Sequence, residues 1–478
     1  MVKVVFLQLN ELNFDYVDRY IAQGKLPHFA ALFERHPYVK TVSESEHHLA
    51  NPWIQWPTVH TGKSYAEHGV FRLGDMVYTD HEHIYEALER RGVRVAALSP
   101  FNAKNNTKDA AFFVPDPWTR TGFVGSRSLR RLYDALVQVA DDYASEKIAT
   151  QALVNLSLGA LDNFMWSSVP AYVKSTYGYL FGGKRWARAI VCDRLLADAF
   201  FTQCRRTKPD FATLFLNGSA HLQHHYLFSS AAYEGPRHNP EWHCGDGEDP
   251  LLEILESYDG ILADLKREMP DARVMVGTGL RQNPHERETY YFRIDDHVRF
   301  LDDIDLDYAD TYRLMTEDFV VHFNSVEEAA AAECRLASVN MIGGDDVFYV
   351  ETADSAVRTQ KKWANIFHIE NRGESLYVQL RPSAVAIPKD AKVVSGEIVV
   401  SNFGERVSFA QYKNTHHQGD GSFIDTGASN LKDPMPLTDV FSHILRAFGI
   451  NRSPARDIAV DTALVNVSEQ RVLAETGA

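Results

Sequence analysis

The chain has 478 residues, 45% hydrophobic and 24% charged, a composition typical of a soluble globular protein with one large core and an insertion. Its formal net charge of −15 argues against a surface that binds nucleic acid or an anionic membrane. The four cysteines lack CxxC spacing, no apolar run approaches a membrane span, and the first residues are typical of a strand, so we expect a cytoplasmic protein.

The first element is a largely apolar run, Val2–Leu9, which predicts a strand buried on both faces of a parallel sheet. Asn10 and Glu11 follow it, at the end of a strand where open α/β sheets place their ligands. Asn10 could bind a metal or cap the next helix. Glu11 could be a ligand, a general base or a solvated loop charge.

Residues 51–71 are rich in Pro, Gly and polar side chains. Pro57 is expected in the first turn of a short helix that contains Thr58 and ends at Gly62 as a C-cap. The free N–H groups of that helix would point toward Asn51–Gln55, a natural seat for an anion. The alternative is a buried turn and helix with a structural role only.

Alternating buried strands and helices continue along the chain and predict an α/β fold. We expect a three-layer sandwich, with a mainly parallel sheet and helices on both faces, and a helical insertion at about residues 121–204. The supporting segments are a helix at His83–Arg91, a strand at Val93–Leu98, a strand at Asp210–Leu216, a helix at Leu251–Glu268 and a strand at Arg273–Val276.

Three histidines, His221, His224 and His225, follow the predicted strand that ends at Leu216. On a helical turn His221 would share one face with His224 or His225, as metal ligands require. Imidazole is a common ligand for zinc, iron and copper. The sequence therefore predicts a metal site at this strand end, with three histidines in a surface loop as the alternative.

The pattern changes at about residue 290, where short alternating strands and an Ala-rich helix begin. This predicts a small α+β insertion over residues 290–397, which could cap the cleft or serve as a spacer. Residues 1–289 and 398–478 would then form the α/β core.

Several runs carry a resemblance to a known family. Trp56-Pro-Thr-Val-His-Thr-Gly-Lys63 and Glu67-His-Gly-Val-Phe71 resemble the nucleophile segment of the alkaline phosphatase superfamily, in its type I phosphodiesterase/nucleotide pyrophosphatase branch. His417 with the following Asp420-Gly421 resembles the family's final metal-binding segment, and Pro436–Gly449 resembles its closing helix. The resemblance covers both ends of the chain and the sheet between them, but neither insertion.

The chain departs from this family at the nucleophile. The resemblance places the family's Thr, Ser or modified Cys at about Asn51 or Pro52, and neither side chain can attack a substrate. Asn51 could instead cap the helix and orient a substrate oxygen. Thr58 and Thr61 are the nearest hydroxyl groups, although the family's geometry directs them toward the core.

The chain also departs from the family at the second metal. Asn10 stands where the family has a ligand Asp, and Thr278-Gly279 stands where it has a ligand Asp-His pair. The first metal site keeps its likeness through His417 and through His224 or His225, and alignment on His224 puts Ala220 in place of an Asp that His221 could replace.

These observations predict a metal-dependent hydrolase of a phosphate or sulfate ester, which uses metal-activated water rather than a covalent nucleophile. The candidate catalytic residues are Glu11, Asn51 and Thr58. A single-metal enzyme of another class (lyase, isomerase, glycosidase or oxygenase) on a reused fold is the first alternative, and a non-catalytic binding protein is the second.

Zinc is the expected metal, with iron or manganese as alternatives. The candidate ligands are Asn10, His221, His224, His225 and His417. We expect a small or glycan-type anionic substrate, with no nucleic acid and no membrane as partner. Lys63, Arg72 and Arg281 are the candidate contacts for its negative charge.

Overall fold

The computed structural model describes residues 2–44, 46, 49–141, 150–286, 289–314, 318–343, 348–351, 357–360, 362–382 and 387–451. Within these ranges, no helix combines the length and the apolar character that crossing a membrane requires.

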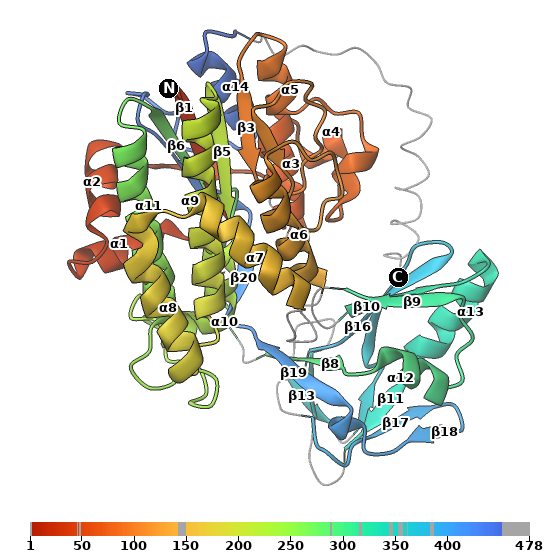
Figure 1. Cartoon of the computed structure of the whole chain (residues 1–478). Helices are drawn as coiled ribbons and strands as arrows, with labels where there is room; N and C mark the ends of the chain where they lie inside the picture. The colour runs from red at the N-terminus through yellow and green to blue at the C-terminus, as the bar shows by residue number, and fades with distance from the viewer. Residues whose placement is uncertain are drawn as a thin grey trace.

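The core is built around an eight-stranded, mainly parallel sheet (Figure 1). Its central strand, β1 (Val4–Leu9), is parallel to β5 (Phe211–Leu216) on one side and to β6 (Arg273–Gly277) on the other. The next strand, β21 (Asp420–Asp425), is antiparallel to both of its neighbours. The order is β22 (Met435–Pro436), β2 (Val39–Val42), β21, β6, β1, β5, β3 (Val95–Leu98) and β4 (Phe112–Val114). The predicted fold class is confirmed.

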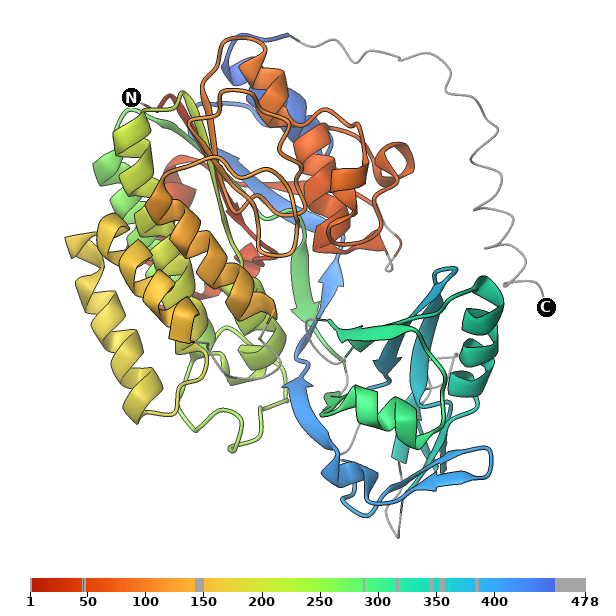
Figure 2. The ribbon, with the colours of Figure 1, turned by 45° about the vertical axis from the view of Figure 1, so that its right-hand side comes forward.

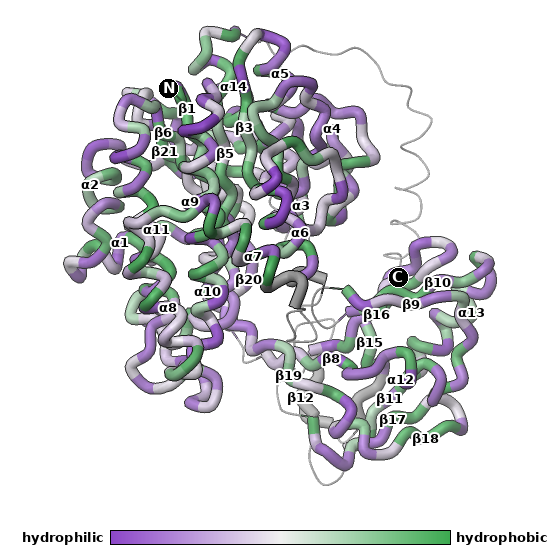
Figure 3. Tube along the Cα trace, in the orientation of Figure 1, coloured by the Kyte–Doolittle hydropathy of each residue, from purple (hydrophilic) through white to green (hydrophobic). Residues whose placement is uncertain are grey.

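Helices cover both faces of the sheet because successive side chains of β1 point to opposite sides. Val5 and Leu7 pack into one hydrophobic cluster, and Val4 and Phe6 into another. Figure 3 shows these hydrophobic strands at the centre of the core. The first cluster contains residues of α1 (Phe14–Ala22), α2 (Pro27–Arg35), α9 (Ala187–Thr207) and α11 (Pro250–Glu268); the second contains residues of α3 (Pro52–Thr61), α5 (Ile84–Glu89) and α14 (Asp439–Ala447).

Helix α3 begins at Pro52 rather than at Pro57, which corrects the sequence prediction. Both prolines suit a first helical turn, but Pro52 follows Asn51, an extended N-cap residue with φ −123°. Pro57 therefore lies inside the helix. Gly62 ends it at φ +69°, as predicted, and a Cβ there would lie 2.9 Å from Phe441. The residues predicted as an open anion seat thus form the cap and first turn of α3.

A helical layer lies between β4 and β5 in the sequence. It places α8 at the outer edge of the molecule and α9 against the sheet (Figure 1). Its helices are α6 (Arg127–Asp141), α7 (Thr150–Asn163), α8 (Val169–Phe181) and α9. Short helices α4 (Tyr65–His68) and α10 (Gly218–Tyr226) follow α3 and β5 respectively.

A third hydrophobic cluster, which runs from Phe292 to Phe403, lies in the α+β insertion beside the core (Figure 2). The chain enters along β7 (Arg281–Pro284) and β8 (Tyr290–Ile294) and returns along β19 (Val407–Tyr412) and β20 (Thr415–Gln418), with β8 paired to β19 and β7 to β20. The predicted domain limits at residues 290 and 397 stay a prediction.

The insertion contains two four-stranded antiparallel sheets and a hairpin within its described residues. The first sheet is β15 (Phe367–Asn371), β16 (Ser375–Leu380), β10 (Asp318–His322) and β9 (Asp310–Arg313). The second is β14 (Lys362–Ala364), β11 (Asn340–Ile342), β17 (Lys392–Ser395) and β18 (Ile398–Val400). The hairpin is β12 (Phe348–Glu351) with β13 (Val357–Gln360), and the helices are α12 (His297–Asp303) and α13 (Val326–Ala337).

Asp425, at the end of β21, is a buried carboxylate with a large electrostatic effect on stability. It accepts hydrogen bonds from Arg273 Nε at 2.8 Å, from Gly427 N at 2.8 Å and from His443 Nε2 at 2.5 Å. Burial raises its pKa, but the hydrogen bonds from Arg273 and His443 outweigh burial and lower the pKa to about 2 from an ordinary 3.8.

Because the folded pKa is depressed, this stabilisation is fully present above about pH 4 and is lost as the pH falls through about 2. Asp425→Asn should lower the free energy of unfolding at pH 7 by about 2 kcal/mol, and less at pH 3. Urea unfolding of wild type and variant at pH 7, 4 and 3 measures the difference. A difference that does not shrink on acidification would contradict this assignment.

Candidate metal centre

Three side chains from separate elements meet at the carboxyl end of β1. Glu11 follows β1, His224 lies on α10, and His417 lies on β20. One possible ligand atom from each residue lies within 4.8 Å of the other two. Among the described residues, these three form the group of side chains that could hold a metal ion. Glu11 has a left-handed backbone, φ +57°, which is uncommon outside glycine and often marks functional sites.

The three facing atoms form a nearly equilateral triangle. Glu11 Oε2 lies 3.1 Å from His224 Nε2 and 3.0 Å from His417 Nε2, and the two nitrogens lie 3.1 Å apart. Ligand atoms bound tetrahedrally to zinc at 2.0–2.1 Å would lie roughly 3.3 Å apart. The spacing therefore fits a small divalent cation with little movement of the side chains. We call these three residues the triangle.

Hydrogen bonds on the outer ring nitrogens fix which atoms face inward. His417 Nδ1 lies 3.1 Å from Asn51 Oδ1, an acceptor, so this nitrogen carries the proton. His224 Nδ1 lies 3.0 Å from Thr415 Oγ1, whose own proton goes to Gln282 Oε1 at 2.5 Å. Both Nε2 atoms then present lone pairs to the centre of the triangle, as metal ligands do.

The carboxylate of Glu11 is held from two sides. Gln282 Nε2 donates to Oε2 at 2.5 Å, and Asn10 Nδ2 donates to Oε1 at 2.9 Å. Gln282 thus contacts Glu11 directly and His224 through Thr415. This arrangement is typical of the outer hydrogen bonds that orient metal ligands.

The protonation states of the triangle also suit a cation. Burial raises the pKa of Glu11, but positive charge on the neighbouring His417 and His224 rings outweighs burial and holds that pKa well below its ordinary value, and a metal cation would supply the same positive charge. Burial lowers the pKa of His224. A charged carboxylate and a neutral imidazole are the forms that bind metals. The placement of Glu11 suits the ligand role that the sequence left open, and its predicted role as a general base stays a prediction.

Asn10 does not join the triangle. Its Oδ1 accepts a hydrogen bond from Trp56 Nε1 at 2.7 Å, and its Nδ2 also donates to Asn217 Oδ1 at 2.8 Å. Trp56 also fills the space beside Gly279, where a Cβ would lie 3.0 Å from the indole ring. An indole ring therefore occupies the region for which the family resemblance implied a second metal.

His221 and His225 lie apart from the triangle, although the sequence grouped them with His224. Their rings pack together with centroids 4.4 Å apart, one helical turn from each other on α10. Burial lowers the pKa of His221 to about 4 and that of His225 well below its ordinary value. In the triangle, Glu11 rather than His221 accompanies His224 and His417.

Thr58 is buried within α3. It is 1% exposed, and its Oγ1 donates to Ile54 O at 3.3 Å within α3. His68 Nε2 donates to the same hydroxyl at 3.2 Å, because His68 Nδ1 accepts from Val70 N. Asn51, in contrast, reaches the triangle through His417.

The three basic candidates are spread over the molecule. Lys63 lies beyond the far end of α3, with Nζ 3.2 Å from His81 Nδ1. Arg72 forms an ion pair with Glu370 of the insertion. Arg281 lies next to Gln282, but its guanidinium bridges Asp15 at 2.9 Å and Asp420 at 3.0 Å. Each of the three therefore contacts a carboxylate or an imidazole, and none of them is part of the triangle. Their predicted contact with a substrate anion stays a prediction.

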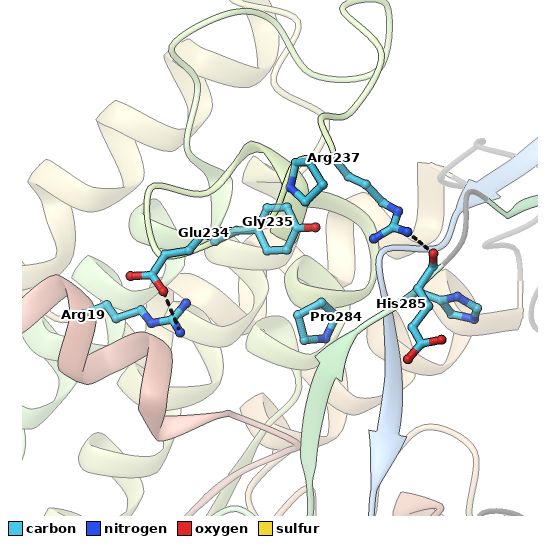
Figure 4. Close-up of a pocket in the computed structure, with 9 residues that line it drawn as sticks. Arg19, Glu234, Gly235, Arg237, Pro284 and His285 are labelled. Atoms are coloured by element: carbon cyan, nitrogen blue, oxygen red, sulfur yellow. Dashed lines mark hydrogen bonds and ion pairs between the residues drawn. The ribbon is translucent and has the colours of Figure 1, made fainter.

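A surface hollow of about 350 Å³ lies beside β7, at Pro284 and His285 (Figure 4). Its lining does not include the triangle. The two arginines at its rim are engaged: Arg19 pairs with Glu234 at 3.3 Å, and Arg237 donates to the backbone oxygen of Glu286.

Sequence reasoning missed Gln282 and Thr415. Their residue types carry no signal, and the pairing of β7 with β20, which sets His417 opposite Gln282, is what brings them to the site. The available signal was that Gln282 lies in the run 277–282, which follows the predicted strand Arg273–Val276.

No family model matches the sequence, and no curated protein matches it. Solved structures that this structure resembles over nearly the whole chain include the following three. Phosphonoacetate hydrolase from Sinorhizobium meliloti 1021 is 14% identical, with 93% of this chain and 95% of that chain covered and a TM-score of 0.41. Murine ectonucleotide pyrophosphatase/phosphodiesterase 5 is 11% identical (98% and 99% covered, TM-score 0.40). The alkaline phosphatase PafA is 12% identical (94% and 96% covered, TM-score 0.43).

Proposed function

We propose that the protein is a metal-dependent hydrolase of a phosphate or sulfate ester, with one divalent metal held by Glu11, His224 and His417. The observation that carries this proposal is the triangle itself, whose three atoms lie 3.0–3.1 Å apart with the outer ring nitrogens already hydrogen-bonded. A divalent metal in such a site supplies a Lewis acid, which activates water and polarises a substrate oxygen.

The chain's own residues position the reacting groups. Asn51 anchors the ring of His417 from the N-terminus of α3, where helix N–H groups favour an anion. Gln282 and Asn10 hold the Glu11 carboxylate in place, so that its charge stays fixed at the site.

The reaction would proceed without a covalent intermediate. Asn51 stands at the position implied for the family's nucleophile, and an amide cannot attack phosphorus or sulfur. Thr58 donates its hydroxyl proton to Ile54 O in the buried interior of α3. Thr61 donates its own to Pro57 O at 2.7 Å.

The donor set favours a second candidate function. Two imidazoles and one carboxylate on one face of a metal are also the ligands of non-haem iron oxygenases. An iron enzyme of that kind is therefore the alternative for the same triangle, and it differs in the metal and in its need for oxygen.

Metal content and turnover of the full-length protein test the proposal. We expect about one zinc or manganese ion per chain, hydrolysis of nitrophenyl phosphate or sulfate esters, loss of activity with a chelator and recovery when the metal is returned. Intact-protein mass spectrometry after quenching should find no adduct on Thr58 or Thr61. One iron with oxygen consumption would favour the alternative, and a fully loaded protein inactive on every ester would refute the hydrolase.

A further inference from the structure

Helix α8 exposes its apolar side chains and buries its small ones. Val173 is 63% exposed, Tyr177 66% and Leu180 63%, and their spacing places them on one helical face. Ser175 and Gly178 are the buried residues of α8. A surface helix of a globular protein normally shows the reverse pattern. The outward stripe of α8 is therefore suited to an apolar partner rather than to water.

The apolar surface continues at both ends of α8. Phe181 is 75% exposed and packs beside Tyr177, with ring centroids 5.2 Å apart. Trp166, just before the helix, is 85% exposed. Among the described residues, nine of the nineteen exposed large hydrophobic side chains lie between positions 154 and 181. Figure 1 shows α8 at the outer edge of the helical layer, where a flat surface could reach it.

An overlapping stretch, residues 164–190, is basic in sequence, although the chain as a whole is acidic. Residues 164–190 contain four basic and no acidic side chains, in a chain with a net charge of −15. Arg188 lies over the ring of Tyr179, with its guanidinium carbon 5.7 Å from the ring centroid. Lys174 pairs with Glu256 of α11 at 2.9 Å and Lys184 with Glu253 at 2.6 Å. Arg185 and Arg188 therefore supply the excess positive charge of the stretch.

We propose that α8 and Trp166 dock onto an anionic lipid surface, with α8 lying in the plane of the headgroups. Exposed Trp, Tyr and Phe favour the boundary between headgroups and acyl chains, and neighbouring Lys and Arg attract lipid phosphates. The 13 residues of α8 span about 20 Å, less than the roughly 30 Å of a bilayer core, so α8 lies on the membrane rather than across it.

Charge favours an anionic lipid surface over a second copy of the chain as the partner of α8. A two-fold interface centred on this stripe would bring Arg185 and Arg188 of both copies to one contact, where like charges repel. The proposal also departs from the expectation drawn from net charge. Charges farther than about 8 Å from the surface are largely screened at physiological salt. With Lys174 and Lys184 paired to glutamates, the local charge is set by Arg185 and Arg188.

Vesicle flotation with the full-length protein tests the proposal. We expect binding to vesicles of phosphatidylcholine mixed with phosphatidylglycerol, weak binding to phosphatidylcholine alone, and a blue shift of the emission that Trp166→Phe removes. The triple variant Tyr177→Ser, Leu180→Ser, Phe181→Ser should lose more than about tenfold in partition. Arg185→Gln with Arg188→Gln should lose roughly fivefold per arginine, and only on the anionic vesicles.

A matched control removes exposed apolar side chains elsewhere. Tyr312→Ser, Ile342→Ser and Val399→Ser together, at positions 41–54% exposed in the insertion, should leave partition unchanged. Absence of binding to the mixed vesicles, or equal losses in the control, would overturn the proposal. So would concentration-dependent dimers, seen by light scattering, that the α8 triple variant dissolves without any vesicle binding in the wild type.

Discussion

Replacing His417 with alanine should reduce bound metal from about one ion per chain to a small fraction of that. His417 Nε2 is one of three facing ligand atoms, and its loss leaves only Glu11 and His224 to hold the cation. Losing an outer hydrogen bond to a ligand typically lowers metal affinity about 10- to 100-fold, so losing a ligand should lower it by more than about 100-fold. Elemental analysis after dialysis, and competition with a chelator, measure the change.

Two histidine variants make matched controls. His221→Ala removes an imidazole from α10 itself, and His416→Ala removes the neighbour of His417 on β20, where alternate side chains point to opposite faces. Both should keep their metal. If His221→Ala loses metal as fully as His417→Ala, the three-histidine site predicted from the sequence is correct and the triangle is not.

Replacing Trp56 should have the largest effect on stability. Trp56 is fully buried between Phe6 and Phe215, with ring centroids 6.5 and 5.3 Å away, and its indole N–H donates to Asn10. Trp56→Ala should lower the free energy of unfolding by about 3–5 kcal/mol through the cavity it leaves. Trp56→Phe should cost about 1–3 kcal/mol, because the buried Asn10 oxygen loses its donor.

Trp56→Phe should also weaken metal binding by about tenfold, since Asn10 holds the Glu11 carboxylate. The exposed Trp242, at 64% exposure, provides the control: Trp242→Phe should change the free energy of unfolding by less than about 0.5 kcal/mol. Urea unfolding and metal titration of both variants make the comparison. If Trp56→Phe kept the unfolding free energy and the metal affinity of the wild type, the indole N–H would have no role and the ring would serve only to fill the core.

The fold was predictable because its main elements carry local signals. A largely apolar run such as the one in β1 indicates a strand covered on both faces, and the structure covers it on both. The start of α3 was not predictable, because Pro52 and Pro57 satisfy the same first-turn preference. Only the tertiary packing of Ile54 and Trp56 distinguishes the two.

The candidate site was predictable only in part. His224 and His417, 193 positions apart, were selected by family resemblance, since no local pattern can join them. The choice between Glu11 and His221 as their companion depends on the left-handed backbone of Glu11, which the sequence does not reveal. Gln282 and Thr415 are common residue types whose role arises from the pairing of β7 with β20.

The insertion leaves the core and returns to it along a single two-stranded ribbon. The β7/β20 pair continues into the β8/β19 pair, and backbone bonds from His285 to Asn414 and from Lys413 to Thr289 join the two. The register that sets His417 opposite Gln282 is therefore fixed on the core side of the ribbon. Residues beyond the ribbon could therefore be lengthened, shortened or replaced during evolution without changing the geometry of the triangle. Such changes would alter only the surface that the insertion presents to a substrate.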